Sequence, residues 1–369
     1  MYSYKGRRAF PWLSFLSLLL PLCLVILFYI TRNNWKIMLW WTETILPYLA
    51  HPLGKLTALV PFSVGEFLVI ALVLGIIFNS CRQIYRKIYK GYPLVNPSHI
   101  FFFLSLALWI WASMSWMWNV LYYVPTLAER SDLTIAPYPI EDLISLTEYF
   151  VQGASEYASQ VSRDEEGYFN VPRSQYFTEG ISLYENIEDQ FPFLTMNSVR
   201  AKYLTLSYLQ SYFGFTGVYI PFTGEANINV HSPSVLQPAV LAHEMAHQRL
   251  IAPELEANFL SIVACLSSEN NTFLYSGYLF GLIQLSNALY PVAPDQWGEI
   301  VDQYFTPELS HDWQSNYNYW QSFQSPVEDV AKDVYDGFLK SNDQRLGIRS
   351  YGACVDLLVA YFYPSLHSV

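Results

Sequence analysis

His243-Glu244-Met245-Ala246-His247 is the stretch of sequence from which the interpretation of this chain starts. It lies in a run, 235–250, that predicts a helix, with Pro238 tolerated in the first turn. Residues four apart on a helix share one face, so the two imidazoles can reach a single ion. Glu244 follows the first histidine and can contact a water molecule on that ion. Two histidines and a carboxylate base at this spacing are what zinc-dependent peptide hydrolysis needs.

The neighbours of the two histidines are apolar, which predicts that this helix is mostly buried. Four residues carry this pattern: Leu241, Ala242, Met245 and Ala246. A buried pair of histidines needs partners, and a zinc ion supplies one. This argument favours a metal site over an amphipathic helix with two surface histidines. His231, just upstream, is the other histidine to follow, although an ordinary loop histidine explains it better.

The segment 251–259, Ile-Ala-Pro-Glu-Leu-Glu-Ala-Asn-Phe, offers a third ligand. Pro253 ends the first helix and suits the first turn of a second one. A catalytic zinc usually has three protein ligands and one open position, so one carboxylate is enough. We favour Glu254, with Glu256 as the alternative, because acidic residues are also common at helix N-termini without a ligand role. Asn258 shares a face with Glu254 and is a candidate partner for a ligand histidine.

These residues resemble the gluzincin pattern of integral-membrane zinc peptidases of the CAAX-prenyl-protease and heat-shock membrane protease type. Those enzymes carry H-E-x-x-H and a later E-x-x-A-D, and the resemblance implies that Glu254 is the third zinc ligand. The chain departs from the pattern at Asn258, which replaces the aspartate, and in a much shorter gap between the motifs.

A closer resemblance, over most of the chain, is to an uncharacterised family of bacterial integral membrane proteins, a domain of unknown function. Its members carry H-E-M-A-H-Q and then E-x-E-A-N-F, after a segment like Pro-Phe-Thr-Gly-Glu-Ala-Asn at 221–227. This resemblance implies a zinc-peptidase-like protein without indicating a substrate.

The composition indicates a protein that is part membrane-embedded and part globular. The chain is 52% hydrophobic, 17% aromatic and only 14% charged. Residues 1–122 hold ten Lys and Arg against two acidic residues, whereas residues 123–369 hold ten against 29. A domain this acidic is not expected to bind nucleic acid.

Three apolar stretches are long enough to span a lipid bilayer, at about 20 residues each: 12–31, 62–80 and 100–122. We interpret the first as a retained anchor, because it is long and no small-residue cleavage site follows it. The sequence therefore predicts a transmembrane region at 1–122 and an extracytoplasmic domain at 123–369.

The orientation follows from the basic residues. Two basic groups flank the predicted spans: Lys5, Arg7 and Arg8, then Arg82, Arg86, Lys87 and Lys90. Three spans put both groups on the cytoplasmic side of a multi-pass cell-membrane protein, and the H-E-x-x-H motif outside. The apolar segment 37–50 is expected to be an interfacial helix; an extra span there would invert this topology.

The outer domain is predicted to be zincin-like and α+β, mostly helical with a small sheet. Two short strands, 217–221 and 225–230, are expected around a Thr223-Gly224 turn. The likeness to zinc peptidases implies that the strand before the motif helix is an edge strand, where a peptide can pair; an ordinary hairpin is the equal alternative. The other expected helices are 139–161, 199–212, 273–288, 327–341 and 351–363.

The sequence thus predicts a membrane-anchored zinc metallopeptidase acting on peptide or protein substrates. His243, His247 and Glu254 bind Zn²⁺, and Glu244 is the general base for a zinc-activated water. The alternative is a non-catalytic membrane protein with a structural or vestigial zinc site, acting in binding or envelope organisation.

Two questions stay open at this level. The transition state needs a stabiliser, for which Tyr219, Tyr351 and Arg349 are candidates without a strong preference. Cys265 and Cys354 are either a disulfide or two buried core residues.

Overall fold

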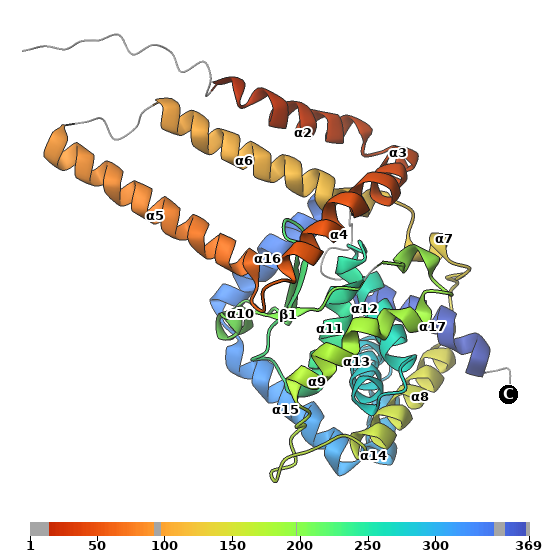
Figure 1. Cartoon of the computed structure of the whole chain (residues 1–369). Helices are drawn as coiled ribbons and strands as arrows, with labels where there is room; N and C mark the ends of the chain where they lie inside the picture. The colour runs from red at the N-terminus through yellow and green to blue at the C-terminus, as the bar shows by residue number, and fades with distance from the viewer. Residues whose placement is uncertain (1–14, 92–96, 197, 343–350, 367–369) are drawn as a thin grey trace, which may run out of the picture.

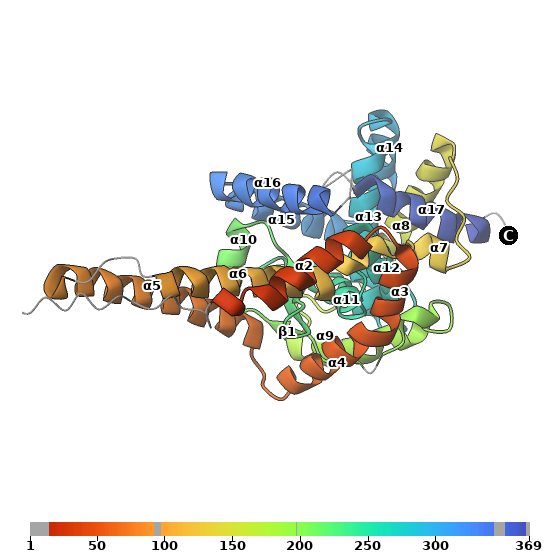
Figure 2. The same cartoon turned by 90° about the horizontal axis from the view of Figure 1, so that it is seen from above.

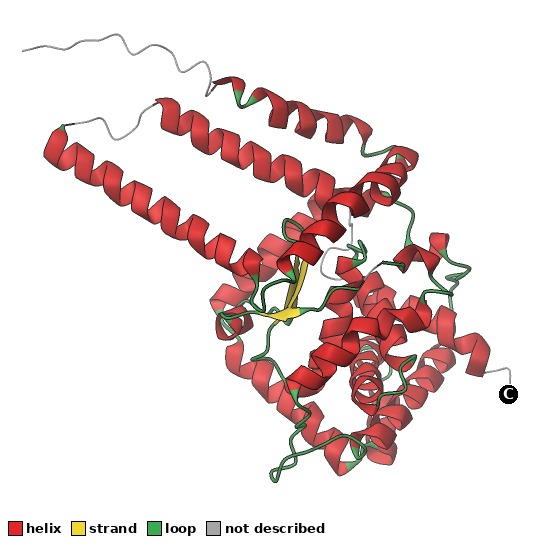
Figure 3. Cartoon of the chain, viewed as in Figure 1, coloured by secondary structure: helices red, strands yellow, loops and turns green. Residues whose placement is uncertain are grey.

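The computed structural model describes residues 15–91, 97–196, 198–342 and 351–366, and it is mostly helical with one small sheet (Figures 1 and 3). Residues from about 119 onward form a helical body. Helices α2, α5 and α6 project from one side of this body, as both views show (Figures 1 and 2).

Two of the projecting helices are long and apolar enough to cross a membrane. These are α5 (Val64–Lys90) and α6 (Pro97–Met117), on which the second and third predicted spans fall. Only 11% of the most apolar window of α5 is buried, so its apolar side chains have little protein cover. The third span ends earlier than predicted, because after Met117 the chain turns into a buried 3₁₀ helix, Asn119–Tyr123, against the body.

The first predicted span is only partly described, since residues 12–14 lie outside the described ranges. In the described part of the chain, α2 (Leu19–Thr31) has 13 residues, which is short for a membrane span. Pro21 explains its late start, because proline has no N–H to donate to the carbonyl of Ser17. The Ser105 hydroxyl on α6 donates to that carbonyl instead, at 3.2 Å. The structure therefore supports two candidate membrane helices and a shorter apolar helix packed on α6.

The predicted interfacial segment forms α3 (Trp35–Trp40), a π-helical turn (Trp41–Ile45) and α4 (Leu46–Thr57). Pro47 accounts for the π turn, because it cannot donate to the carbonyl of Glu43, and the Leu46 N–H bonds Trp41 instead. One side of this segment packs into a core cluster that also contains Trp118 and Leu121.

The sheet has three strands in the order β1-β3-β2: β1 (Lys202–Tyr203), β2 (Gly217–Ile220) and β3 (Glu225–Ile228). The predicted hairpin around Thr223 and Gly224 is present. The prediction that the strand before the motif helix is an edge strand is wrong: β3 is central, because β1 and β2 pair with its two sides and form the edges. The predicted helix at 199–212 is correct only from Ser207 to Tyr212 (α10), since Leu204 bonds to β3.

The body is built around α8 (Ile140–Ala158), α11 (Gln237–Gln248), α12 (Glu254–Leu266), α13 (Asn271–Leu289) and α17 (Tyr351–Leu366), whose buried residues form one core. The smaller helices around this core are α7 (Leu127–Arg130), α9 (Arg173–Glu179), α14 (Pro294–Tyr304), α15 (Pro307–Phe323) and α16 (Pro326–Ser341). Three 3₁₀ segments complete the body: Gly180–Ile187, Pro192–Leu194 and Ser234–Leu236. Cys265 and Cys354 are free, buried thiols in this core, so the disulfide alternative does not hold here.

An ion pair, which we call the clamp, joins the start of α5 to the sheet. The Lys202 ammonium donates to the Glu225 carboxylate at 2.5 Å, and both side chains are almost fully buried. The same carboxylate accepts the backbone N–H groups of Val64 and Gly65, the first residues of α5. In return, Glu66 on α5 accepts two N–H groups from the loop after β1. The membrane-type helix is therefore fixed to the sheet by charged hydrogen bonds.

Candidate metal centre

The H-E-x-x-H motif lies on α11, which begins after a 3₁₀ turn and carries Pro238 in its first turn, as predicted. The helix ends at Gln248, and Leu250 adopts a left-handed conformation with φ of 64°. Among the described residues it is the only one other than glycine with positive φ, a conformation that costs a branched side chain energy. This tight turn brings the start of α12, at Glu254, back against the histidines.

The three predicted ligands lie together. The Nε2 atom of His243 is 3.1 Å from one Glu254 oxygen, and that of His247 is 3.7 Å from the other. One ligand atom from each residue lies within 4.8 Å of the other two. Bonds of about 2.0–2.1 Å in a tetrahedral zinc site place ligand atoms roughly 3.3 Å apart. The two distances, each to a different Glu254 oxygen, lie on either side of this value, so the spacing and the chemistry of the donor set are compatible with Zn²⁺.

The ring nitrogens of the two histidines are held differently. The Nδ1 atom of His247 lies 2.6 Å from the carbonyl oxygen of Ile251, which fixes the ring with Nε2 toward Glu254. The edge of Trp118 packs on the same ring. The Nδ1 atom of His243 is buried and has no hydrogen-bond partner among the described residues. The far side of the His247 ring is thus held by the tight turn, whereas His243 has only its contact with Glu254 and packing.

Glu244 is buried directly beside this group. A Cβ atom on Gly217, in the edge strand β2, would come within 2.5 Å of a Glu244 oxygen, so only glycine fits there. The other oxygen of Glu244 is buried without a hydrogen-bond partner in the described part of the chain. Burial raises the pKa of Glu244 to about 7, against a partial offset from the two histidines. A carboxyl group with a pKa near neutrality suits proton transfer at physiological pH.

The charges within the group attract a cation. Burial works against ionisation of Glu254, but the two histidines outweigh it and hold the pKa of Glu254 well below its usual value. Burial likewise opposes protonation of His247, but Glu254 outweighs it and raises the pKa of His247 to about 9. A proton on His247 and a metal ion therefore compete for the same negative charge.

The alternative ligand and the other predicted candidates are not among the three side chains that converge here. Glu256 accepts the Leu127 N–H at 2.8 Å and does not face the histidines. His231 pairs with the Tyr319 hydroxyl, at 2.8 Å, as expected of a loop histidine. Tyr219 packs on Trp118. Arg349 and the side chain of Tyr351 lie outside the described residues.

Two tyrosines that sequence reasoning missed face the predicted ligands. The Tyr335 hydroxyl on α16 donates to Glu254. Tyr122 follows α6 and has a buried hydroxyl, and burial, then the Glu254 charge, raise its pKa. Both side chains come from segments 81 or more residues away in sequence, so no local pattern points to them.

Comparisons with known proteins confirm the resemblance to an uncharacterised family, and they do not show the resemblance to gluzincin peptidases. A family model described as "Protein of unknown function (DUF3810)" matches residues 41–359, which is most of the chain. No curated protein and no solved structure matches this chain. The chain belongs to the DUF3810 family.

Proposed function

We propose that this DUF3810 protein is a membrane-anchored zinc metallopeptidase that hydrolyses peptide bonds. The observation that carries the proposal is the convergence of His243, His247 and Glu254 to within 4.8 Å beside the buried carboxyl of Glu244. Three ligands leave one position of a tetrahedral ion open, which is the composition of a catalytic site. A structural site does not need a neighbouring base.

In this proposal each residue of the centre has one task. His243, His247 and Glu254 hold the ion, which when bound supplies a Lewis acid for the water and the scissile carbonyl. Glu244 accepts a proton from the attacking water and delivers it to the leaving amine. Tyr122 and Tyr335 are the candidate donors to the oxygen on which negative charge develops, because their hydroxyls lie on the Glu254 side.

The edge strand β2 is the candidate place for an extended substrate. The Asn229 N–H bonds the carbonyl of Thr216, so the alternation of an antiparallel pair turns the backbone groups of Gly217 and Tyr219 away from β3. Gly217 also touches Glu244. A peptide or protein segment added to this edge would lie beside the base.

The same proposal places α2, α5 and α6 in the cell membrane as three spans. The basic residues at the far end of α5 favour a cytoplasmic position for that end. Because α5 and α6 leave and return to the same side of the body, the body is then extracytoplasmic even if α2 does not cross.

The alternative, a non-catalytic protein with a structural zinc site, is favoured by one observation. The Tyr335 hydroxyl already contacts Glu254, and a fourth protein ligand closes a structural site. Under this alternative Tyr335 would bind the ion, and the protein would act in binding or envelope organisation.

The test begins with the metal content of the purified full-length protein, measured by elemental analysis. We expect about one zinc per chain in the wild type and in Glu244→Gln, and loss of zinc in His247→Ala and Glu254→Ala. His231→Ala is the matched control, since this histidine lies outside the centre, and it should keep its zinc. A folded wild type that binds no zinc would overturn the proposal.

The second half of the test measures hydrolysis. The zinc-loaded protein is incubated with an unbiased peptide mixture, and new termini are identified by mass spectrometry. Cleavage that disappears in Glu244→Gln supports a peptidase. Stable zinc without cleavage, together with zinc loss in Tyr335→Phe, would support the structural alternative.

A further inference from the structure

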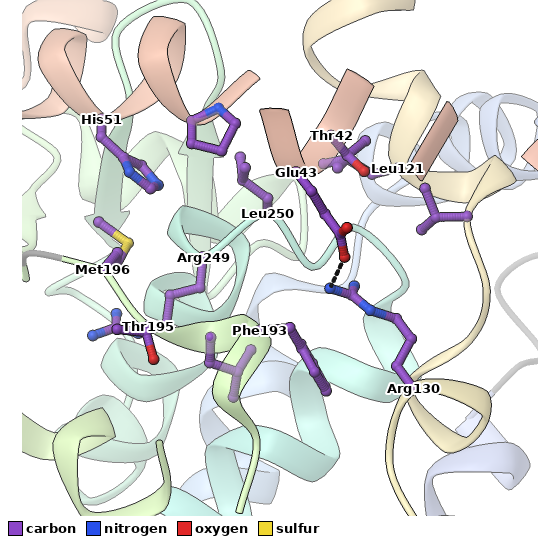
Figure 4. A pocket seen from close by; sticks show the side chains of 13 residues that line it. Thr42, Glu43, His51, Leu121, Arg130, Phe193, Thr195, Met196, Arg249 and Leu250 are labelled. Carbon is purple, nitrogen blue, oxygen red and sulfur yellow. Dashed lines mark ion pairs between the residues drawn. The ribbon is translucent and has the colours of Figure 1, made fainter. Parts of the chain in front are cut away.

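A cavity of about 590 Å³ lies between the α3–α4 segment and the body (Figure 4). Its size is within the usual range for small-molecule sites. Its roof includes Glu43 and His51, and its walls include Leu121, Arg130, Phe193 and Arg249. None of the predicted metal ligands lines it.

The lining carries an excess of positive charge. It includes two guanidinium groups and one carboxylate, and Glu43 and Arg130 pair across the cavity at 3.6 Å (Figure 4). His51 is affected by this positive charge: burial, and then the charges of Arg249 and Lys55, lower its pKa. One guanidinium is therefore left without a counter-charge in the lining.

Arg249 is that group, and it is only 4% exposed. It stacks over the Tyr184 ring at 4.2 Å and donates to the Ser198 hydroxyl and, weakly, to the Met245 carbonyl. Its Nε atom is buried without a partner among the described residues, and the charges of Glu188 and Glu185 act on it without forming an ion pair with it. A buried charge is costly unless it is paired. An anion in the cavity would supply the missing partner.

The outer face of the α3–α4 segment, which covers the cavity, indicates the source of that anion. The α3–α4 segment turns large side chains outward, with Trp35, Trp40, Tyr48 and Leu49 each 44–79% exposed. Tryptophan and tyrosine concentrate at membrane–water interfaces, where lipid headgroups lie. The segment also joins α2 to α5, so the roof of the cavity is directly connected to two of the projecting helices (Figure 1).

We propose that this cavity binds a phosphate group, and that its source is the headgroup of an anionic membrane lipid. The guanidinium groups of Arg130 and Arg249 are suited to phosphate, which accepts two parallel hydrogen bonds from such a group. Free inorganic phosphate offers the same chemistry and is distinguished by experiment. The proposal depends on the membrane placement of this protein and not on zinc chemistry.

The test uses the purified full-length protein in nanodiscs of phosphatidylcholine with or without phosphatidylglycerol. Retained lipids are counted by native mass spectrometry, and thermal midpoints are compared. We expect retention of phosphatidylglycerol over phosphatidylcholine, and a loss of affinity of about tenfold or more in Arg130→Gln and in Arg249→Met. Lys36→Gln, which removes a charge from the same segment outside the cavity, should change little.

Further variants and a phosphate-binding measurement distinguish the possible outcomes. Arg249→Lys retains the charge if Arg249→Met fails to fold, and Arg130→Gln changes a more accessible wall residue. Binding of inorganic phosphate with the same variant dependence, without any gain from the lipid, would keep the anion site and overturn its lipid source. Retention of phosphatidylglycerol that neither arginine variant weakens, or no binding of either anion, would overturn the proposal.

Discussion

Two of the buried groups of charged side chains in the described structure differ in how they are paired: one lies between α11 and α12, and the other where α5 meets the sheet. In the clamp, Glu225 accepts from Lys202, Val64 and Gly65. In the candidate metal centre, His243 and Glu244 each keep a buried polar atom without a partner in the described structure. A group that satisfies all of its charges within the chain contributes to the fold, whereas one that leaves atoms unpaired is arranged for something from outside.

The variant expected to have the largest effect on this comparison removes the proposed general base, Glu244. Glu244→Gln should lower peptide hydrolysis by about 10²–10⁴-fold, because proton transfer by a positioned carboxylate contributes that much. Zinc content and the thermal midpoint should stay close to those of the wild type. Hydrolysis rates and elemental analysis on the same preparation check this, and full activity in the variant would be incompatible with the proposed role.

Variants of the clamp should lower stability and leave hydrolysis unchanged, which is the opposite of the result expected for Glu244→Gln. Glu225→Gln leaves the Lys202 ammonium buried without a counter-charge and should lower the free energy of unfolding by about 3–5 kcal/mol. The double variant Lys202→Met/Glu225→Met should lose less than the single one. Denaturant unfolding in detergent measures both, and hydrolysis per folded molecule should not change. Equal losses in the single and double variants would show that the ion pair is not the source.

The pH dependence of stability separates the clamp further. Burial would raise the pKa of Glu225, but Lys202 and the N–H groups of Val64 and Gly65 together outweigh it and lower that pKa. The stabilisation is therefore complete above the unfolded pKa of about 4.3 and is lost as the pH falls through the lower folded value. Thermal midpoints from pH 7 to pH 3 should fall less steeply in Glu225→Gln than in the wild type.

One added methyl group, in Gly217→Ala, should lower the rate of hydrolysis through its contact with Glu244. In Gly217→Ala the new Cβ would meet the Glu244 carboxyl, and displacement of a reacting group by about 1 Å can cost 10²-fold in rate. Gly298→Ala is the matched control, because a Cβ there meets nothing within 4 Å. Comparable rates in the two variants would mean that Glu244 is not held by β2.

The smallest effect is expected at Tyr335. Removal of its hydroxyl in Tyr335→Phe should weaken zinc binding by about 10–100-fold, as for other groups that orient a metal ligand. Tyr317→Phe, on an exposed residue, is the control. Competition with a zinc chelator measures the affinity. An unchanged affinity would leave Tyr335 as a candidate for contact with the substrate only.

The part of the centre that the sequence predicts depends on short-range geometry. The spacing of His243 and His247 and the proline before Glu254 fix a helix, a turn and a second helix, whatever the rest of the chain does. The hairpin around Thr223 was predicted for the same reason. Tyr335 and Gly217 were not, because their contacts depend on how distant segments pack.

Two incorrect predictions, of the helix at 199–206 and of the end of the third span, also arise from contacts between distant segments. Residues 199–206 have a helical pattern, but β3 offers Leu204 a backbone partner and Glu225 offers Lys202 a counter-charge, so the segment is extended. The end of the third span was placed too late because Val120 and Leu121 are as apolar as a membrane segment. They are buried by the body instead, which composition alone does not distinguish.

If the proposed peptidase activity is correct, the clamp has a consequence for which peptide bonds are cut. Glu225 holds the first turn of α5, β3 pairs with β2, and β2 touches Glu244, so no flexible linker separates the membrane-type helix from the base. In the proposed topology the candidate metal centre then lies at a fixed distance from the bilayer surface. Such a protein would select a peptide bond by its distance from the membrane surface as well as by its sequence.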